Sequence, residues 1–417
     1  MQTGLTSGAI DPTSVMEVGS GFQMLAMLLI LGLGPLSKPW RTSQMKKSLV
    51  ALAVLAASGA VMAQSSVTLS GNVKAGLAQT KYSGLTAGNG SATGLADGSS
   101  RFILSGTEDL GGGLKANFQV DTRYRMDDNG AAPTSSPLAG GSTFVGLSGS
   151  MGNVQAGKLD THYCMGSDSH GTRATALQAS SCALLGFVNG SGAGQAIANA
   201  SRITNVVRYT APTMGGLTLQ ATKSFSTASS EGAVGTTQDG GADHFQGVYT
   251  QGALTLGASM YQQKGEDQTA TVARTGQKAS TFMVNYNLGF ATVGLTRDQS
   301  AQRAAAAGAG FVDTKRTATS LPVTIPMGTG TALFTYTKAD ASKTAGVTNA
   351  GTGSKLMSIG YDLALSKRTS LGVSYASLNN DANAAYGLYT QTALNGTPAQ
   401  AKGQDSTQFY VGVRHAF

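Results

Sequence analysis

The sequence predicts an all-β protein, a single antiparallel barrel of 16 transmembrane strands. Three observations indicate this fold. Many short segments alternate large apolar residues with small or polar ones, and short glycine-rich turns alternate with long polar stretches. The chain also ends in an alternating strand whose last residue is Phe417. A soluble protein seldom leaves such an edge uncovered, whereas a strand that closes a barrel in lipid has no free edge.

The amino-terminal region has the pattern of a secretion signal at residues 45–63. Lys46 and Lys47 precede a short apolar run, and small residues lead up to Ala63, after which we expect cleavage. The apolar run is shorter than the about 20 residues that a transmembrane helix needs. We therefore expect residues 64–417 to form the exported barrel. Because a secretion signal normally begins at the first methionine, we expect translation to start at Met45 and the doubtful extension 1–44 not to be made.

The composition agrees with a barrel. The chain has 417 residues with 57 glycines, only 9 prolines and 12% charged residues, and no run of 18 apolar residues follows Ala63. The formal net charge is +8, of which +2 comes from residues 1–63, so +6 remains in the barrel. Aromatic-flanked basic runs are missing, so we expect no nucleic-acid partner. Cations that face a lumen would instead favour anions in transit.

The strands follow from the alternation, taken in chain order. In the first, Leu77 and its period-2 neighbours form an apolar outward face, while Asn72 and Lys74 fall on the inward face. Residues 83–100 are polar and small, and we expect them to form an external loop. The 16 strands are expected at 67–77, 101–107, 114–125, 144–150, 153–158, 203–211, 217–225, 245–250, 254–262, 281–288, 291–297, 317–325, 331–338, 355–363, 369–378 and 408–417. Strands of a soluble β protein would alternate in the same way, but the signal, the turn–loop asymmetry and the terminal Phe417 together favour the membrane barrel.

Several stretches carry a more specific resemblance. They are the residues SVTLSG at 66–71, SRFILSGTEDLGGGLKA at 100–116, FVGLSG at 144–149, NVVRYTAP at 205–212, YDLALSKRT at 361–369 and GVRHAF at 412–417. Together they resemble the general trimeric porins of Gram-negative bacteria, close to those of β-proteobacteria. The resemblance implies a homotrimer in the cell outer membrane, surrounded by lipid and lipopolysaccharide. It also implies a third extracellular loop, about 159–202 in this chain, that folds into the lumen as a constriction.

Charged residues on the inward face are the candidates for a pore constriction, because a selectivity filter needs fixed charges in a narrow, wet section. The alternation places Lys74, Arg101, Lys115, Arg123 and Arg208 there. Arg101 lies in a matching family stretch and is the first choice. Alternation indicates which face of the strand a residue occupies, but not its height along the barrel axis. The other four residues are therefore equally consistent with solvated lumen charges away from the constriction. The resemblance implies that wall arginines face loop acids, which here are Asp160 and Asp168.

The third loop also carries the only two cysteines, Cys164 and Cys182. In an oxidising compartment a disulfide would close a loop of about 18 residues, worth about 3 kcal/mol in the chain-entropy model. Free thiols are a second interpretation, and a metal site with His162 and His170 is a third. The spacing matches no common zinc module, so we expect no metal and no cofactor.

The expected function is a water-filled channel for passive diffusion of small hydrophilic solutes and ions, with a weak preference for anions. Two alternatives stay open: a substrate-specific channel with an enlarged third loop, and a non-conducting barrel that acts as an adhesin or anchor. We expect no enzyme, because the scattered serines have neither a base nor an orienting acid near them in the sequence.

Overall fold

The computed structural model describes residues 66–84, 89–97, 100–126, 138–161, 180–185, 202–226, 241–263, 276–306, 310–388 and 400–417, with only the backbone at 303–306, 310 and 311. The chain divides into two compact units, Met1–Met62 and Ala63–Phe417, and all described residues belong to the second. The signal at 45–63 and the extension at 1–44 lie outside the described residues and stay predictions. No helix among the described residues is long and apolar enough to cross a membrane.

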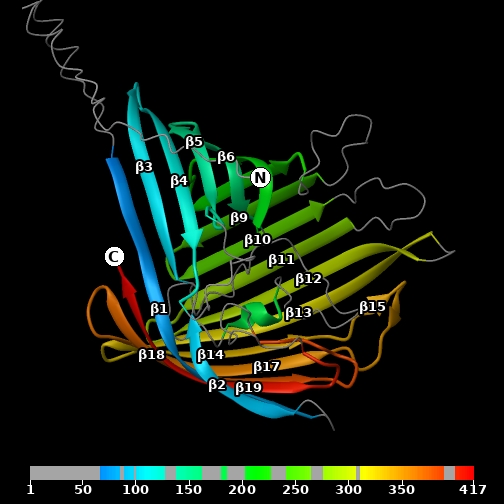
Figure 1. Cartoon of the computed structure of the whole chain (residues 1–417). Helices are drawn as coiled ribbons and strands as arrows, with labels where there is room; N and C mark the ends of the chain where they lie inside the picture. The colour runs from blue at the N-terminus through cyan, green and yellow to red at the C-terminus, as the bar shows by residue number, and fades with distance from the viewer. Residues whose placement is uncertain are drawn as a thin grey trace, which may run out of the picture. The chain divides into compact units, whose positions relative to one another are not determined.

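The second unit is a closed antiparallel barrel of 16 strands, as the alternation predicts (Figure 1). Its sheet has 19 strand segments because β2 and β3 follow one another along β1, and because β15 and β16 form a small hairpin beside β13. The segments are β1 (Ser66–Ser83), β2 (Gly90–Asp97), β3 (Arg101–Gly111), β4 (Leu114–Arg123), β5 (Thr143–Gly149), β6 (Gly152–Asp160), β7 (Arg202–Thr210), β8 (Leu217–Ser224), β9 (Ala242–Gln251), β10 (Leu254–Gln263), β11 (Gly276–Asn287), β12 (Thr292–Ala306), β13 (Gly310–Met327), β14 (Gly330–Ala339), β15 (Lys343–Thr344), β16 (Val347–Thr348), β17 (Ser354–Ala364), β18 (Thr369–Asn380) and β19 (Asp405–Ala416).

The last strand closes the barrel on the first. β19 pairs with β1 in antiparallel register, with Asn72 opposite Ala416. The final residue extends this ladder, because Gly71 and Phe417 exchange both backbone hydrogen bonds at 3.1 Å. The expectation that the terminal phenylalanine belongs to a barrel-closing strand is therefore confirmed. No edge is left along β1 or β19 for another chain to pair with.

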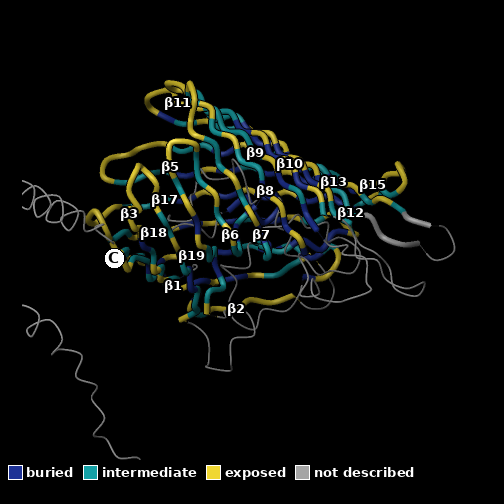
Figure 2. The backbone as a smooth tube through the Cα atoms, turned by 90° about the horizontal axis from the view of Figure 1, so that it is seen from above, coloured by how far each residue is buried: buried dark blue, intermediate teal, exposed yellow. Residues whose placement is uncertain are grey.

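Side chains alternate between an outer and an inner face along the barrel strands, and Figure 2 shows this as alternating exposed and buried residues. In β1, Leu77 is 56% exposed whereas Lys74 is only 1% exposed. The outer face carries large apolar side chains such as Val145 and Phe334, while the inner face carries small polar ones such as Thr335. A barrel embedded in a lipid bilayer requires an apolar outer face, and its inner face is polar.

The shortest turns use glycine where the backbone demands it. Gly111, Gly112 and Gly113 have φ of 84°, 60° and 81°, a region that residues with a Cβ rarely adopt. The Asp109 carboxylate accepts a hydrogen bond of 2.9 Å from the Gly111 N–H. The three-glycine run is thus a hairpin turn between β3 and β4, as the sequence predicts.

One element was not expected. The tract 83–100 was predicted to be an external loop, and this is wrong for Gly90–Asp97, which form β2 and pair with β1 from Ala75 to Tyr82. The segment consists mostly of Gly, Ser, Ala and Thr, so it shows no large apolar residues at period 2. Its backbone hydrogen bonds to β1 hold it in the barrel.

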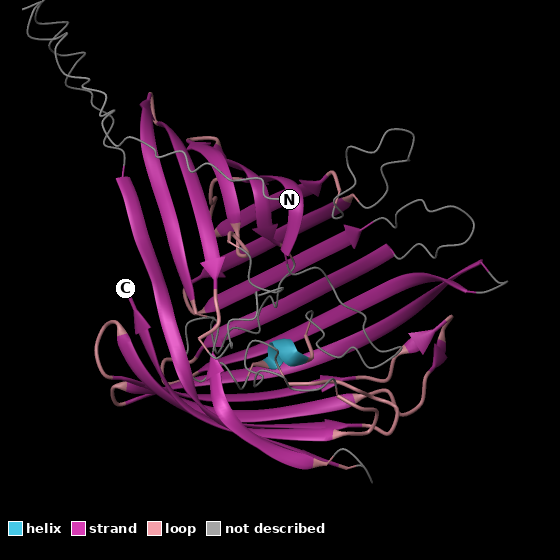
Figure 3. Ribbon diagram, in the orientation of Figure 1, coloured by secondary structure: helices cyan, strands magenta, loops and turns pink. Residues whose placement is uncertain are grey.

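The described residues 182–185 pack on an apolar patch of the barrel wall. The 3-10 helix η2 (Ser181–Ala183), cyan in Figure 3, is followed by Leu184 and Leu185, which are 0% and 1% exposed. They cluster with inward residues of β13, β14, β17 and β18, which we call the apolar wall: Ala318, Ala339, Leu356, Ala376 and Leu378. Residues 162–179 and 186–201 of the expected loop lie outside the described residues, so its course through the lumen stays a prediction.

Candidate pore-lining site

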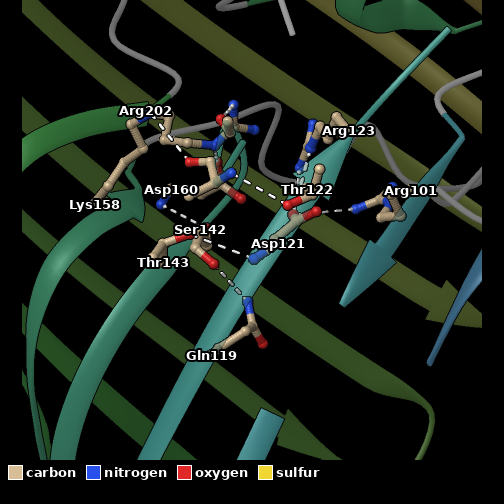
Figure 4. A network of polar contacts seen from close by, with 12 residues as sticks. Arg101, Gln119, Asp121, Thr122, Arg123, Ser142, Thr143, Lys158, Asp160 and Arg202 are labelled. Atoms are coloured by element: carbon tan, nitrogen blue, oxygen red, sulfur yellow. Dashed lines mark hydrogen bonds and ion pairs between the residues drawn. The ribbon is translucent and has the colours of Figure 1, made fainter. Parts of the chain in front are cut away.

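Two arginines of neighbouring strands face each other across a carboxylate on the inner wall (Figure 4). Arg101 of β3 is the cross-strand partner of Arg123 of β4. Like charges placed directly opposite are destabilising. Asp121, two residues before Arg123 and on the same face, offsets this. Its Oδ2 lies 3.2 Å from Arg123 Nη2 and 3.9 Å from Arg101 Nη1.

The backbone around Asp121 holds this carboxylate in place. The Asp121 carbonyl oxygen accepts a 2.8 Å hydrogen bond from the Gly141 N–H, and the Asp121 N–H donates to Thr143 Oγ1 at 3.4 Å. A Cβ at Gly141 would overlap the Asp121 carboxylate. The side chain of Asp121 is only 3% exposed, while those of Arg101 and Arg123 are 13% and 20% exposed. Of these three groups, the two cations therefore have more access to the lumen.

A second group of charges lies on β6 and β7. A register shift in β6 between Gly157 and Leu159 lets Asp160 pair across to Arg202, whose Nε lies 2.8 Å from Asp160 Oδ1. Arg208 Nη2 donates to the Asp160 carbonyl oxygen, and its Nε donates to Thr222 Oγ1 at 3.2 Å. Both arginines are thereby fixed against the wall.

The two groups adjoin through the segment that joins β4 and β5. Arg202 Nη1 donates to the Gly140 carbonyl at 3.1 Å, and Lys158 Nζ donates to the Ala139 carbonyl at 3.4 Å. We call the whole set the arginine cluster, which consists of Arg101, Arg123, Lys158, Arg202 and Arg208 with Asp121 and Asp160. Five cations against two carboxylates leave an excess of positive charge. In a low-dielectric wall such an excess attracts anions and repels cations.

The structure brings together three of the predicted wall cations: Arg101, Arg123 and Arg208. Lys115 faces inward but lies at the other end of β4, where it is the cross-strand neighbour of Asp109 beside the glycine turn. It is therefore not part of the arginine cluster.

Lys74 is also on the inner face but is covered. It is 1% exposed, its Nζ lies 5.9 Å from the centre of the Tyr410 ring, and its N–H donates to Ser100 Oγ at 3.0 Å. A side chain covered in this way does not meet solutes in the lumen directly.

The predicted place of Asp160 is wrong. It was expected in the third loop, opposite the wall cations, but it is the last residue of β6 and lies among them. Period-2 alternation stops at the bulge between Gly157 and Leu159. The strand continues beyond this bulge and ends at Asp160. Asp168, the other expected loop acid, lies outside the described residues.

Sequence reasoning missed Lys158, Arg202 and the role of Asp121. Asp121 was recognisable as an inward residue, but its place between two arginines depends on the register of β3 against β4. Arg202 begins β7, and Lys158 lies within the register shift of β6, where a period-2 pattern no longer assigns a face.

A separate buried ion pair lies on the opposite wall. Arg316 Nη2 is 3.6 Å from Asp298 Oδ1, and its guanidinium lies 5.8 Å from the centre of the Tyr386 ring. All three residues are at most 2% exposed. A pair covered in this way is not in direct contact with the lumen.

The predicted cysteine chemistry falls mostly outside the described residues. Cys182 is 5% exposed in η2, and its N–H donates to Ser180 Oγ at 3.2 Å. No cysteine among the described residues is free. Cys164, His162 and His170 lie outside the described residues, so the disulfide stays a prediction. No group of three or more His, Cys, Asp or Glu in the described part of the chain could hold a metal ion.

Residues 48–383 match the family described as Gram-negative porin. The chain belongs to this family. Outer membrane porin protein 32 of Delftia acidovorans is 34% identical over 392 residues, which is 89% of this chain and 100% of that relative. Major outer membrane protein P.IB of Neisseria meningitidis is 37% identical over 121 residues, or 28% of this porin and 34% of the relative.

Solved structures agree with the barrel of this porin. An anion-selective porin from Comamonas acidovorans superimposes with a TM-score of 0.69 and 26% identity, covering 85% of this chain and 100% of the other. OmpT of Vibrio cholerae matches with a TM-score of 0.58 at 13% identity, over 85% of this chain and 98% of its own, and shows the fold alone. The protein is thus an outer-membrane porin.

Proposed function

We propose that the protein forms a water-filled outer-membrane channel for passive diffusion of small hydrophilic solutes, with a weak preference for anions. The observation that carries this proposal is the arginine cluster, in which five cations face two carboxylates on one section of the inner wall. The anion-selective porin of Comamonas acidovorans has the same barrel, which supports the sign of the preference. No catalytic step is assigned to the protein, whose relatives are channels.

The constriction is proposed to combine the arginine cluster with the third loop. Support comes from Ser180–Leu185, which are buried against the apolar wall although the loop starts from β6. A disulfide between Cys164 and Cys182 would stiffen this loop, and the absence of a free cysteine among the described residues agrees with it. Asp168 is proposed as an acidic residue of this loop that faces the wall arginines.

The working form is proposed to be a homotrimer in contact with outer-membrane lipid and lipopolysaccharide. One solved OmpT of Vibrio cholerae with this fold is described as a trimer form, at 12% identity. Export through a signal at 45–63, with cleavage after Ala63, is part of the same proposal.

Planar-bilayer recording of the refolded 64–417 protein tests the function. The proposal predicts conductance steps in threes, a linear current–voltage relation and a reversal potential of the anion-selective sign in a potassium chloride gradient. A folded, heat-modifiable barrel that passes no current would contradict the channel and favour an adhesin or anchor. Liposome swelling with sugars and organic acids separates a general channel from one that selects a single solute.

A further inference from the structure

An irregular piece of the barrel wall lies beside the end of β4. It consists of residues 139–142, which we call the wall segment and which precede β5 without belonging to a strand. Ladder pairing between β4 and β5 stops at Gln119, and the wall segment continues along β4 from there. Figure 4 shows Ser142 of this segment beside Asp160. The wall segment contributes no charged side chain, and the proposed channel assigns it no role.

Hydrogen bonds to β4 hold the wall segment in place. The Ala139 N–H donates to Thr122 Oγ1 at 3.2 Å, and the Gly141 N–H donates to the Asp121 carbonyl at 2.8 Å. Ala139 has a φ of 62°, a region that residues with a Cβ rarely adopt. Thr122 is 7% exposed, so water does not readily replace its hydroxyl as the acceptor. The Thr122 hydroxyl therefore fixes a backbone conformation that is unfavourable by itself.

The wall segment in turn holds the two residues that flank the expected third loop. Asp160 ends β6 and Arg202 begins β7, and the ion pair between them closes the base of that loop. Arg202 Nη1 donates to the Gly140 carbonyl at 3.1 Å. The Asp160 N–H donates to Ser142 Oγ at 3.3 Å. Both members of the ion pair are therefore tied to the wall segment.

Backbone carbonyls hold a cation without cancelling its charge. A carboxylate partner adds a negative charge, whereas a carbonyl accepts a charge-assisted hydrogen bond and has no net charge. The Ala139 carbonyl accepts such a bond from Lys158 Nζ at 3.4 Å. Arg101 lies within electrostatic range of both Asp160 and Arg202. The course of the wall segment therefore sets the spacing between the charge of Arg202 and that of Arg101.

We infer that Thr122 is a positioning residue for anion selection. Its hydroxyl fixes the wall segment, whose carbonyls hold Arg202 and Lys158 in a set place relative to Arg101. Thr122 carries no charge and acts through these cations. A preorganised cation stabilises a passing anion without the entropy cost of first ordering a long side chain. This inference rests on the proposed anion-preferring channel and adds to it a residue outside the charged cluster.

The reversal potential of Thr122→Val in a potassium chloride gradient tests this role. Valine keeps the branched shape but removes the acceptor of the Ala139 N–H. The anion-to-cation permeability ratio should fall roughly threefold, the factor that corresponds to the loss of one hydrogen bond. Thr122→Ser keeps the hydroxyl and should retain the wild-type ratio. The matched control is Thr337→Val, because Thr337 is 0% exposed and its hydroxyl lies 2.8 Å from Ser320 Oγ, away from the arginine cluster. It should also retain the wild-type ratio.

A double-variant cycle separates positioning from general stability. K158Q/R202Q removes both cations through which Thr122 acts, so Thr122→Val should change the permeability ratio no further in that background. An equal change in both backgrounds would overturn the inference, as would a wild-type ratio in folded Thr122→Val. Where heat-modifiability shows that Thr122→Val does not fold, Ala139→Pro removes the donor of the same bond and is judged by the same outcomes. A wild type that conducts without anion preference refutes the proposed function, whereas an anion preference that Thr122→Val leaves unchanged refutes only this inference.

Discussion

The two sides of the lumen carry different kinds of side chains, charged on one side and apolar on the other. On β3, β4, β6 and β7 the wall carries the arginine cluster, whose arginines stay partly accessible. On β13, β14, β17 and β18 it carries the apolar wall, which is buried under Leu184 and Leu185. A wall that selects ions has to keep its charges wet, whereas a wall that anchors a loop has to exclude water. The comparison teaches that one barrel carries accessible charges and a buried packing surface on different strands.

The largest effect is expected from breaking the anchor with Leu184→Asp. Leu184 is 0% exposed, so a carboxylate there would be buried without a partner at a cost of several kcal/mol. The segment should leave the apolar wall, and single-channel conductance and open-channel noise should rise. Leu184→Met keeps the volume and costs less than about 1.5 kcal/mol, so it should behave as the wild type. Unchanged conductance of the aspartate variant would show that the anchored segment does not limit the pore.

A smaller effect is expected from removing the acid between two cations. Asp121→Asn leaves Arg101 opposite Arg123 without a carboxylate and should destabilise the barrel by about 1–3 kcal/mol. It should also increase the preference for anions, as measured by the reversal potential. Asp243→Asn is the control, because it removes the same charge from the outer face. An equal shift in both variants would mean that bulk charge, not the cluster, sets selectivity.

The smallest effect concerns ionic strength. The Debye length falls from about 10 Å at 0.1 M salt to about 3 Å at 1 M. The anion preference of the wild type should decrease over this range, because partly exposed arginines are screened. A preference that is independent of salt would indicate selection by pore size and not by the charges of the cluster.

Much of the fold could be predicted from the sequence, because period-2 alternation and glycine turns act locally. The closing strand at Phe417 and the inward face of Lys74 followed directly. The strand Gly90–Asp97 could not be predicted, since its small residues show no alternation and its pairing with β1 is a long-range contact.

The site was predicted in part for a related physical reason. Alternation gave the inward face of Arg101, Arg123 and Arg208, but it cannot give height along the barrel. Lys115 was assigned to the correct face of β4, but it lies at the end of the strand that is away from the arginine cluster. Asp160 and Arg202 meet only because a bulge shifts the register of β6, and no local pattern indicates where that shift falls.

The most direct test compares two charge reversals on the same barrel, R101E/R123E in the cluster and K115E beside the turn. Reversal potentials are measured in one potassium chloride gradient after heat-modifiability confirms folding. The cluster variant should shift the anion-to-cation permeability ratio roughly tenfold toward cations, about 1.4 kcal/mol, and change the sign of the potential. K115E should change it little. Equal shifts, or a cluster variant that keeps the wild-type potential, would contradict the claim that the arginine cluster is the selective section of the pore.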